Sequence, residues 1–461
     1  MKASPTPCRV AVLVLGCALT ACASTKPTAA AEDVSELVGA RAGLDDVAWT
    51  ARKDADAQAD VDRRVTALLA SPLTTDSAMR IALLNNRELA ATIEDLGIAQ
   101  ADLVEAGLLA NPTISGDIIS STQGNGLGGG LGLSQSLLSA LLIPAKKRVA
   151  KAELEHTIVS VTQSTLTLLR DVKVAYAGVQ AAVANRNLQR TLVQTAEVAD
   201  EYARRMLEAG NTTELERELF AADLDEARLG LNDASLDVTM ARETLNQHLG
   251  LWGGQIHWRL VGLLPEPPKT EAELARVEQF GIAQRLDLSA ARFHTESIDY
   301  ALQLRRRGLV PEVEVGVEAG NEVGNDAGHE WVVGPTLSIE IPIFDPGHAD
   351  LARLGAQLRQ SQHRQQSMAI HARSEIRGHR ASLLSHREQA LYLRDTVLPR
   401  RNTLGQRALE RYNAMLIGAF ELLEVRAGKV KAQRDYVEAL HAYWVARAEL
   451  ELAVGGHLPS P

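Results

Sequence analysis

The chain has 461 residues, a formal net charge of −10 and only 4% aromatic residues. Its acidic balance, without a dominant basic patch, argues against nucleic acid as a partner. Abundant Ala, Leu, Arg, Glu and Gln suit long helices better than one large compact core.

The first residues have the pattern of a secretory signal. A positively charged start precedes the apolar run Val10–Leu19, which is shorter than the roughly 20 residues that a membrane-spanning helix needs. The run ends in Leu-Thr-Ala-Cys, and this tetrapeptide, closing at Cys22, resembles the lipobox of bacterial lipoproteins. Residues 1–21 are therefore expected to be a cleaved signal peptide, and Cys22 is expected to carry the lipid, palmitate included. The alternative is an ordinary signal peptide whose cysteines are incidental.

The other cysteines and the residue after Cys22 bear on the compartment. Cys8 and Cys17 lie in the part that would be removed, so the mature chain would keep one thiol and no disulfide. Ala23 follows Cys22, where Asp would be the usual signal for retention at the inner membrane. The sequence therefore predicts a lipoprotein of the cell outer membrane.

Two copies of one plan make up the rest of the chain, and self-similarity at a fixed offset is stronger evidence than any single motif. Each copy has a helical stretch, a proline, two strands and two long helices. The first helical stretches are Thr75–Leu109 and Glu271–Gly308, and the last landmarks, matched residue by residue, are Leu249–Leu251 and Ala453–Gly455. The predicted divisions are a lipid-anchored segment at 22–72, the first copy at 73–251, an equatorial connection at 252–284, the second copy at 271–455 and a tail at 456–461.

A period of two residues predicts β-hairpins at about 112–137 and 311–343. From Glu312 onward, Glu or Gly alternates with Val or Ala, and an apolar alternation resumes at Val333. The first hairpin has a weaker alternation and a glycine-rich loop, Gln123–Gly130. Each hairpin would have one apolar side and one polar side.

Strands of about ten residues can cross a bilayer when tilted. Four of them cannot close a barrel, and an open edge in lipid leaves backbone groups unpaired, so other copies of the chain must complete the sheet. The alternative is one face of a soluble sandwich. With the apolar side toward lipid, the glutamates of the polar side would line a lumen: Glu312, Glu314, Glu318, Glu322 and Glu340.

Two stretches read as very long helices, Ala145–Met206 and Pro346–Leu409, the second interrupted only by glycines and by Pro399. The second would reach on the order of 90 Å. Helices of this length need partners along their sides, as in a coiled coil. Simple helix packing would leave the same apolar stripe.

The order of these parts resembles the TolC family of outer membrane factors along nearly the whole mature chain. The residues that carry the resemblance are Ala78–Asn86, Gly107 to Pro112, the strand-to-helix junction Leu337–Asp345, Tyr412-Asn413 and Glu421–Glu424.

The resemblance implies an α+β membrane protein. Long helical hairpins would form a periplasmic α-barrel, and four strands per protomer would contribute to a twelve-stranded β-barrel in a homotrimer. A small equatorial domain would come from Ser24–Pro72, Trp252–Gln284 and the tail. The resemblance also implies docking on a periplasmic adaptor and an inner-membrane efflux pump, with substrate passing outward through the duct without chemistry.

The resemblance places a gate at the periplasmic helix turn. Tyr412 matches the family's aromatic residue, and Glu421 and Glu424 match its acidic pair. Met415 stands where glycine is usual, so one alternative is a turn shifted to Gly418. Ile417 stands where some members have an arginine. Further candidates in the first copy are Glu214 and Glu216. The alternative for all four glutamates is a solvated carboxylate at a helix tip without a role in the gate.

Other chemistries have less support. Four histidines share one long helix, but offsets of seven and eight residues separate them by about 10 Å, too far for one ion. They are His363, His371, His379 and His386. No catalytic or phosphate-binding motif occurs, so neither an enzyme nor a cofactor or metal is expected. The rival function is a lipid-anchored coiled-coil scaffold or adaptor without a pore, and metal cations are one cargo class that the acidic lumen would suit.

Overall fold

The computed structural model describes residues 28–44, 55–120, 127–268, 277–308, 312–323, 329–341 and 343–458. The lipidation candidate Cys22 lies outside them. The chain divides into two compact units. Unit 1 comprises residues 1–33, 94–158 and 289–365, and unit 2 comprises residues 34–93, 159–288 and 366–461. Among the described residues, no helix is both long enough and apolar enough to cross a membrane.

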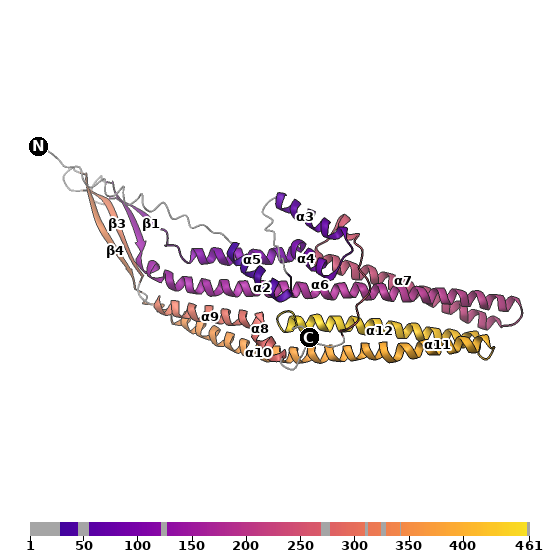
Figure 1. Cartoon of the computed structure of the whole chain (residues 1–461). Coiled ribbons are helices and arrows are strands. Elements are labelled where there is room, and N and C mark those ends of the chain that lie inside the picture. The colour runs from indigo at the N-terminus through magenta and orange to yellow at the C-terminus, as the bar shows by residue number, and fades with distance from the viewer. Residues whose placement is uncertain are drawn as a thin grey trace. The chain divides into compact units, whose positions relative to one another are not determined.

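Unit 1 carries a four-stranded antiparallel sheet whose strands lie in sequence order (Figure 1). The third strand pairs with the second, so the two predicted hairpins join into one sheet. The first and fourth strands are its edges. The strands are β1 (Thr113–Ser120), β2 (Leu127–Ser136), β3 (Glu312–Val323) and β4 (His329–Glu340).

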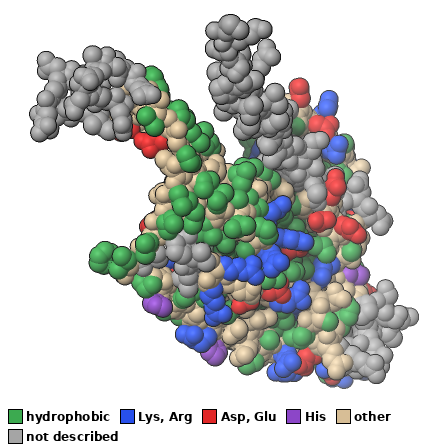
Figure 2. Space-filling view, turned by 90° about the vertical axis from the view of Figure 1, so that its left-hand side faces the viewer, with side chains coloured by type: hydrophobic (Ala, Val, Ile, Leu, Met, Phe, Trp, Pro, Cys, Tyr) green, Lys and Arg blue, Asp and Glu red, His purple; other side chains and the backbone are tan. Residues whose placement is uncertain are grey.

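The register aligns apolar residues in a row across all four strands. Leu133 of β2 pairs with Ile114 on one side and Val317 on the other, and Val317 pairs in turn with Pro335. Because side chains alternate between faces, one face of the sheet is apolar and the other carries acidic, hydroxyl and glycine residues. Viewed from the side of the strands, Figure 2 shows hydrophobic side chains gathered at this end of unit 1. The predicted two-residue alternation is therefore confirmed, and it forms one continuous surface.

The helix α6 (Leu137–Glu208) follows β2 directly and has 72 residues. The sequence predicted its start at Ala145, and that boundary is wrong. Ser136 caps the earlier start, because its Oγ accepts a hydrogen bond of 3.2 Å from the amide of Ser139. Pro144 consequently stands inside the helix, where it removes one backbone donor.

Each predicted helical stretch before the strands consists of two helices. In the first copy, α4 (Thr75–Asn85) and α5 (Arg87–Glu105) are separated by Asn86. The Oδ1 atom of Asn86 accepts a hydrogen bond of 2.8 Å from the Leu89 amide and caps α5. In the second copy, α8 (Val277–Gln284) and α9 (Leu286–Arg307) are separated by one residue in the same way.

The long stretch of the second copy continues through a proline by means of a π turn. α10 (His348–Tyr392) leads into the π turn Leu393–Val397, and α11 (Leu398–Asn413) follows without a break. Pro399, the second residue of α11, lacks the amide hydrogen that a regular α-helix uses there. The wider turn lets the helix pass the proline instead of ending at it.

The described part of the chain contains further helices, most of them labelled in Figure 1. They are α2 (Thr28–Ala42), α3 (Ala55–Ala70), α7 (Glu214–Leu249), the short 3-10 helix η1 (Gly253–Ile256) and α12 (Ala419–Ala453).

Two glycines of unit 2 lie close to the backbone at the breaks between consecutive helices, one at the α4–α5 break and one at the α8–α9 break. Gly250 (φ 65°) follows α7, and a Cβ on it would lie 2.6 Å from the carbonyl oxygen of Asn85. Gly455 (φ 80°) follows α12, and a Cβ on it would lie 2.7 Å from the carbonyl oxygen of Gln284. These glycines are structural equivalents, so the predicted match of Gly250 with Val454 is wrong by one residue. Only a residue without a side chain allows this approach in a left-handed conformation.

The segment 252–268 is held against the helices of unit 2. The guanidinium of Arg242 lies 3.8 Å from the ring centre of Trp258. Trp444 of α12 donates its indole N–H to the carbonyl oxygen of Pro265 at 2.9 Å. These contacts bind a segment without long helices to the helix surface, one in its middle and one towards its C-terminal end.

Candidate functional site

The turn between α11 and α12 carries the predicted gate residues. α11 ends at Asn413, and α12 begins after Gly418, an extended N-cap. Met415 has a φ of 59°, the left-handed conformation that favours glycine. The left-handed position therefore stays at residue 415, and the alternative of a turn shifted to Gly418 is wrong.

The turn between α6 and α7 has the same backbone plan. Gly210 is left-handed, with a φ of 73°, at the position equivalent to Met415. Thr213 stands at the N-cap of α7, as Gly418 does at the N-cap of α12, and only Thr213 adds a side-chain cap, forming a reciprocal capping box with Glu216. Glu216, a candidate from the sequence, thus stabilises the start of a helix.

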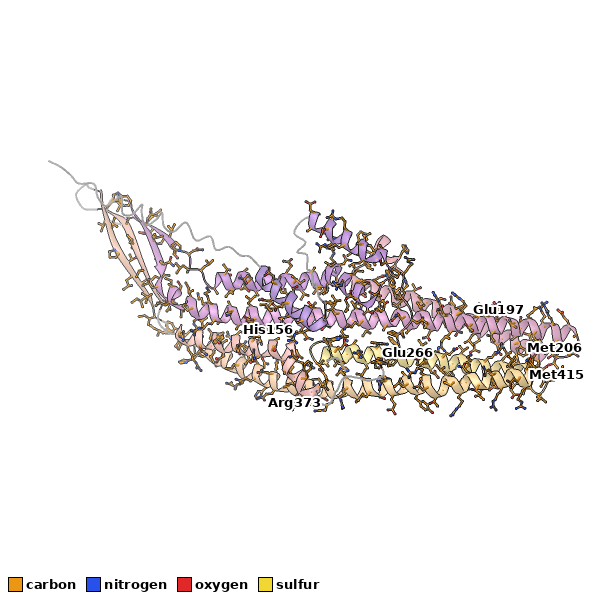
Figure 3. All side chains as sticks on the ribbon, viewed as in Figure 1. His156, Glu197, Met206, Glu266, Arg373 and Met415 are labelled. Carbon is orange, nitrogen blue, oxygen red and sulfur yellow. The ribbon has the colours of Figure 1, made fainter. Side chains whose placement is uncertain are left out.

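A hydrogen bond joins the two turns within one chain. Tyr412 of α11 is bonded to Tyr202 of α6, and this bond, followed by partial burial, raises the pKa of the Tyr412 hydroxyl. Met206 and Met415 mark these turns at one end of unit 2 (Figure 3). The sequence predicted Tyr412 but missed Tyr202, because nothing local relates residues so far apart in the chain.

Glu421 and Glu424 are exposed on the first turns of α12, and their spacing places them on the same side of that helix. Glu424 also lines an open cavity of about 450 Å³ between α6, α7 and α12. In a single chain the two carboxylates are therefore solvated, and they would form rings only when copies of the chain surround one axis.

The start of α12 packs against the first hairpin through apolar side chains, with Ala419 and Leu423 lying against a buried cluster of Ala199, Ala203 and Phe220. Phe220 of α7 and Phe420 of α12 meet edge to face with ring centres 6.4 Å apart. Both rings border the 450 Å³ cavity and a second one of about 430 Å³ nearer the turns. Both cavities are open to solvent, so they are surface grooves beside the packed apolar cluster and not voids within it.

The polar face of the sheet holds the predicted lumen glutamates. The side chain of Glu314 accepts a hydrogen bond of 3.2 Å from Ser134 Oγ on the neighbouring strand. Glu322 lies in β3, but its side chain is outside the described residues. The exposed members are Glu312, Glu318 and Glu340.

Glycine makes room for carboxylates on this face. A Cβ on Gly130 would lie 2.5 Å from Asp117 Oδ1 and 3.4 Å from Glu318 Oε1. Asp117 therefore belongs to the acidic face, although it was not among the predicted lumen residues. Its signal was its alternation with Ile114 and Ile118 on β1.

A family model supplies the identification. The model of the outer membrane efflux protein family matches residues 78–251 and 281–456. The chain belongs to this family. The two matches agree with the predicted internal repeat, and the resemblance to outer membrane factors is confirmed. Membership supports the general role of an outer-membrane efflux channel, and the family description names no catalysed reaction.

Solved structures of the same kind share the fold. The CmeC outer membrane channel of Campylobacter jejuni is 17% identical, with a TM-score of 0.70 over 84% of this chain and 89% of that chain. The outer membrane protein VceC of Vibrio cholerae is 15% identical, with a TM-score of 0.68 over 83% of this chain and 96% of that one. The open state of the MtrE channel of Neisseria gonorrhoeae is 16% identical, with a TM-score of 0.64 over 83% and 89%. The curated proteins give no match.

Proposed function

We propose that the chain is the outer-membrane exit duct of a tripartite efflux system. Three copies form a homotrimer, in which three four-stranded sheets close one β-barrel and the helical hairpins form a periplasmic tunnel. The tunnel receives substrate from a periplasmic adaptor and an inner-membrane pump and conducts it passively outward. Segments 22–72, 252–284 and 456–461 make the equatorial part.

The observation that carries this proposal is the sheet of unit 1. Its apolar face is strongly exposed in the single chain, with Ile118 83% and Val333 67% accessible. Both edge strands, β1 and β4, have one side without a partner among the described strands. An apolar face suits lipid, while an open edge in lipid is unfavourable, so sheets of neighbouring copies must pair. The acidic opposite face then lines a lumen that favours cations.

The rival is a lipid-anchored scaffold without a pore. A scaffold would have no use for a sheet with one apolar and one acidic face. The two functions are separated by purifying the full chain in detergent and measuring single-channel conductance in planar bilayers. We expect a heat-modifiable trimer and discrete conductance steps. A monomer without conductance would support the scaffold.

We propose that Cys22 carries a lipid that is a second anchor, since the sheet already holds the body in the membrane. Cys22→Ala with a cleavable signal peptide should weaken targeting or assembly in cells, measured as the trimer yield from outer membranes. The protein that does assemble should conduct as the wild type does. A complete loss of trimer insertion would show that the lipid is the main attachment.

We propose that the turn between α11 and α12 is the gate. In a trimer, Glu421 and Glu424 form two rings of carboxylates, and the Tyr202–Tyr412 hydrogen bond holds this turn against the first hairpin. The open grooves beside Phe420 leave space into which the turn moves. Carboxylate rings attract cations and exclude anions.

The combined variant Glu421→Gln/Glu424→Gln tests the rings. We expect the cation-to-anion permeability ratio to fall by at least about twofold, because charged rings set ion selectivity. The measurement is the reversal potential of single channels in a salt gradient. The control is Glu410→Gln, which makes the same chemical change at an exposed position of α11. Equal ratios in wild type and double variant would place the constriction elsewhere.

A further inference from the structure

Three potential metal ligands converge in unit 1, whereas the residues of the proposed gate belong to unit 2. Glu153 and His156 lie on α6, and His294 lies on α9. One carboxylate oxygen and one ring nitrogen from each histidine all lie within 4.8 Å of one another. The two imidazole rings have centres 5.4 Å apart and planes inclined by 40°. His156 is labelled on its helix in Figure 3.

Helix geometry explains why the first two ligands share a face. Residues three apart are neighbours on the surface of an α-helix, so Glu153 and His156 project to the same side of α6. The third ligand comes from a different helix and a distant part of the sequence. A single ion held by all three would therefore link α6 to α9.

A hydrogen bond to the backbone fixes the ring of His156. Its Nδ1 lies 2.9 Å from the carbonyl oxygen of Ala290. A carbonyl oxygen only accepts, so Nδ1 carries the hydrogen, and Nε2 keeps a free lone pair. Metal-binding histidines are commonly fixed in this way, with the second ring nitrogen donating to a carbonyl or a carboxylate. This bond is an observation independent of the cluster itself.

The donor set indicates the kind of ion. Two neutral imidazoles and one carboxylate suit zinc and its neighbours, whereas calcium and magnesium prefer oxygen ligands only. Bonds of about 2.0–2.2 Å put the ligands of a tetrahedral ion roughly 3.3–3.6 Å apart, so the three atoms, which lie within 4.8 Å of one another, need to approach by at most about 1.5 Å. Glu153 and His294 are exposed and can turn about their side-chain bonds to do so.

We propose that Glu153, His156 and His294 bind a divalent transition-metal ion of the zinc type, with solvent as its fourth ligand. His156 is partly buried and the other two residues are exposed, so the ion enters from solvent. The site was not predicted from the sequence, which indicated no metal. The proposal does not depend on conduction, because binding is measured on the protein itself.

The test is a titration of the full-length protein in detergent, purified without a histidine tag and freed of metal with a chelator. Zn²⁺ is added in competition with a metal indicator. We expect one Zn²⁺ per chain, and we expect Glu153→Gln, His156→Asn and His294→Asn each to weaken binding at least about tenfold. The matched control is His363→Asn, an exposed histidine of α10 in the same unit.

A second measurement covers the case in which a variant folds poorly. Binding to the native state raises the melting temperature, so Zn²⁺ should raise that of the wild type and of His363→Asn but not that of His294→Asn. X-ray absorption at the zinc edge should show imidazole nitrogens at about 2.0–2.1 Å. Absence of stoichiometric binding by the wild type, or equal affinity in wild type and His294→Asn, would overturn the proposal.

Discussion

Val317→Arg is expected to abolish stable trimers in the outer membrane. Val317 lies on the apolar face of the sheet, between Leu133 of β2 and Pro335 of β4. An arginine on a lipid-facing strand costs about 2–4 kcal/mol near the bilayer midplane. Three copies in a trimer raise this to roughly 6–12 kcal/mol, which is comparable with the whole stability of a typical folded domain, about 5–15 kcal/mol.

The neighbouring residue supplies the matched control. Glu318→Arg introduces the same side chain one position along β3, where the register turns it to the acidic face. We expect trimers to form at wild-type levels and the cation preference of the channel to fall. Trimer yield from outer membranes, read on unheated gels, compares the two variants. A wild-type yield of trimers with Val317→Arg would mean that the apolar face does not meet lipid. Loss of trimers with Glu318→Arg but not with Val317→Arg would mean the same.

Gly250→Ala is expected to destabilise unit 2 by about 2–4 kcal/mol. The left-handed conformation costs an L-residue about 1–2 kcal/mol. The added Cβ would in addition lie 2.6 Å from the Asn85 carbonyl oxygen, which is backbone and can move only with the end of α4. That movement would disturb the side-chain amide of Asn85, which donates to the carbonyl oxygen of Gly250 at 2.7 Å. Loss of helical circular dichroism on heating in detergent measures the effect.

Two nearby glycines separate the causes. Gly253 is also left-handed, with a φ of 59°, but a Cβ there would meet no atom within 4 Å. Gly253→Ala should therefore show the conformational cost alone. Gly254 has neither feature, so Gly254→Ala should melt like the wild type. If Gly250→Ala loses no more stability than Gly253→Ala, the contact with α4 does not matter.

The local pattern of residue types was enough to predict the strands and helices in which apolar residues recur with a fixed period. A strand with one apolar face must alternate with a period of two, so the hairpins and the faces of Val317 and Glu318 could be predicted from the sequence. Long helices and the internal repeat were visible for the same reason, because a period can be read without knowing any contact. The left-handed residue of the turn was harder to predict from the sequence, since Met415 occupies a position that its residue type disfavours.

Boundaries and equivalences depended on contacts between distant residues. The start of α6 at Leu137 depends on the cap at Ser136 rather than on apolar period. Gly250 and Gly455 are recognised as equivalent only in the structure. Each lies against the backbone carbonyl oxygen of a residue that is far away in sequence, Asn85 for Gly250 and Gln284 for Gly455. A pattern of residue types does not contain these distances.

The sequence by itself determined the class of this protein, its repeat, its strand faces and the position of the acidic turn. The strand faces follow from residues close together in the chain, the repeat from self-similarity at a fixed offset, and the class and the acidic turn from a resemblance carried by short motifs in order. Only the tertiary structure decided that Tyr412 is bonded to Tyr202 and that His294 meets Glu153 and His156. These pairings come from different helices, and helix packing alone brings such residues within bonding distance.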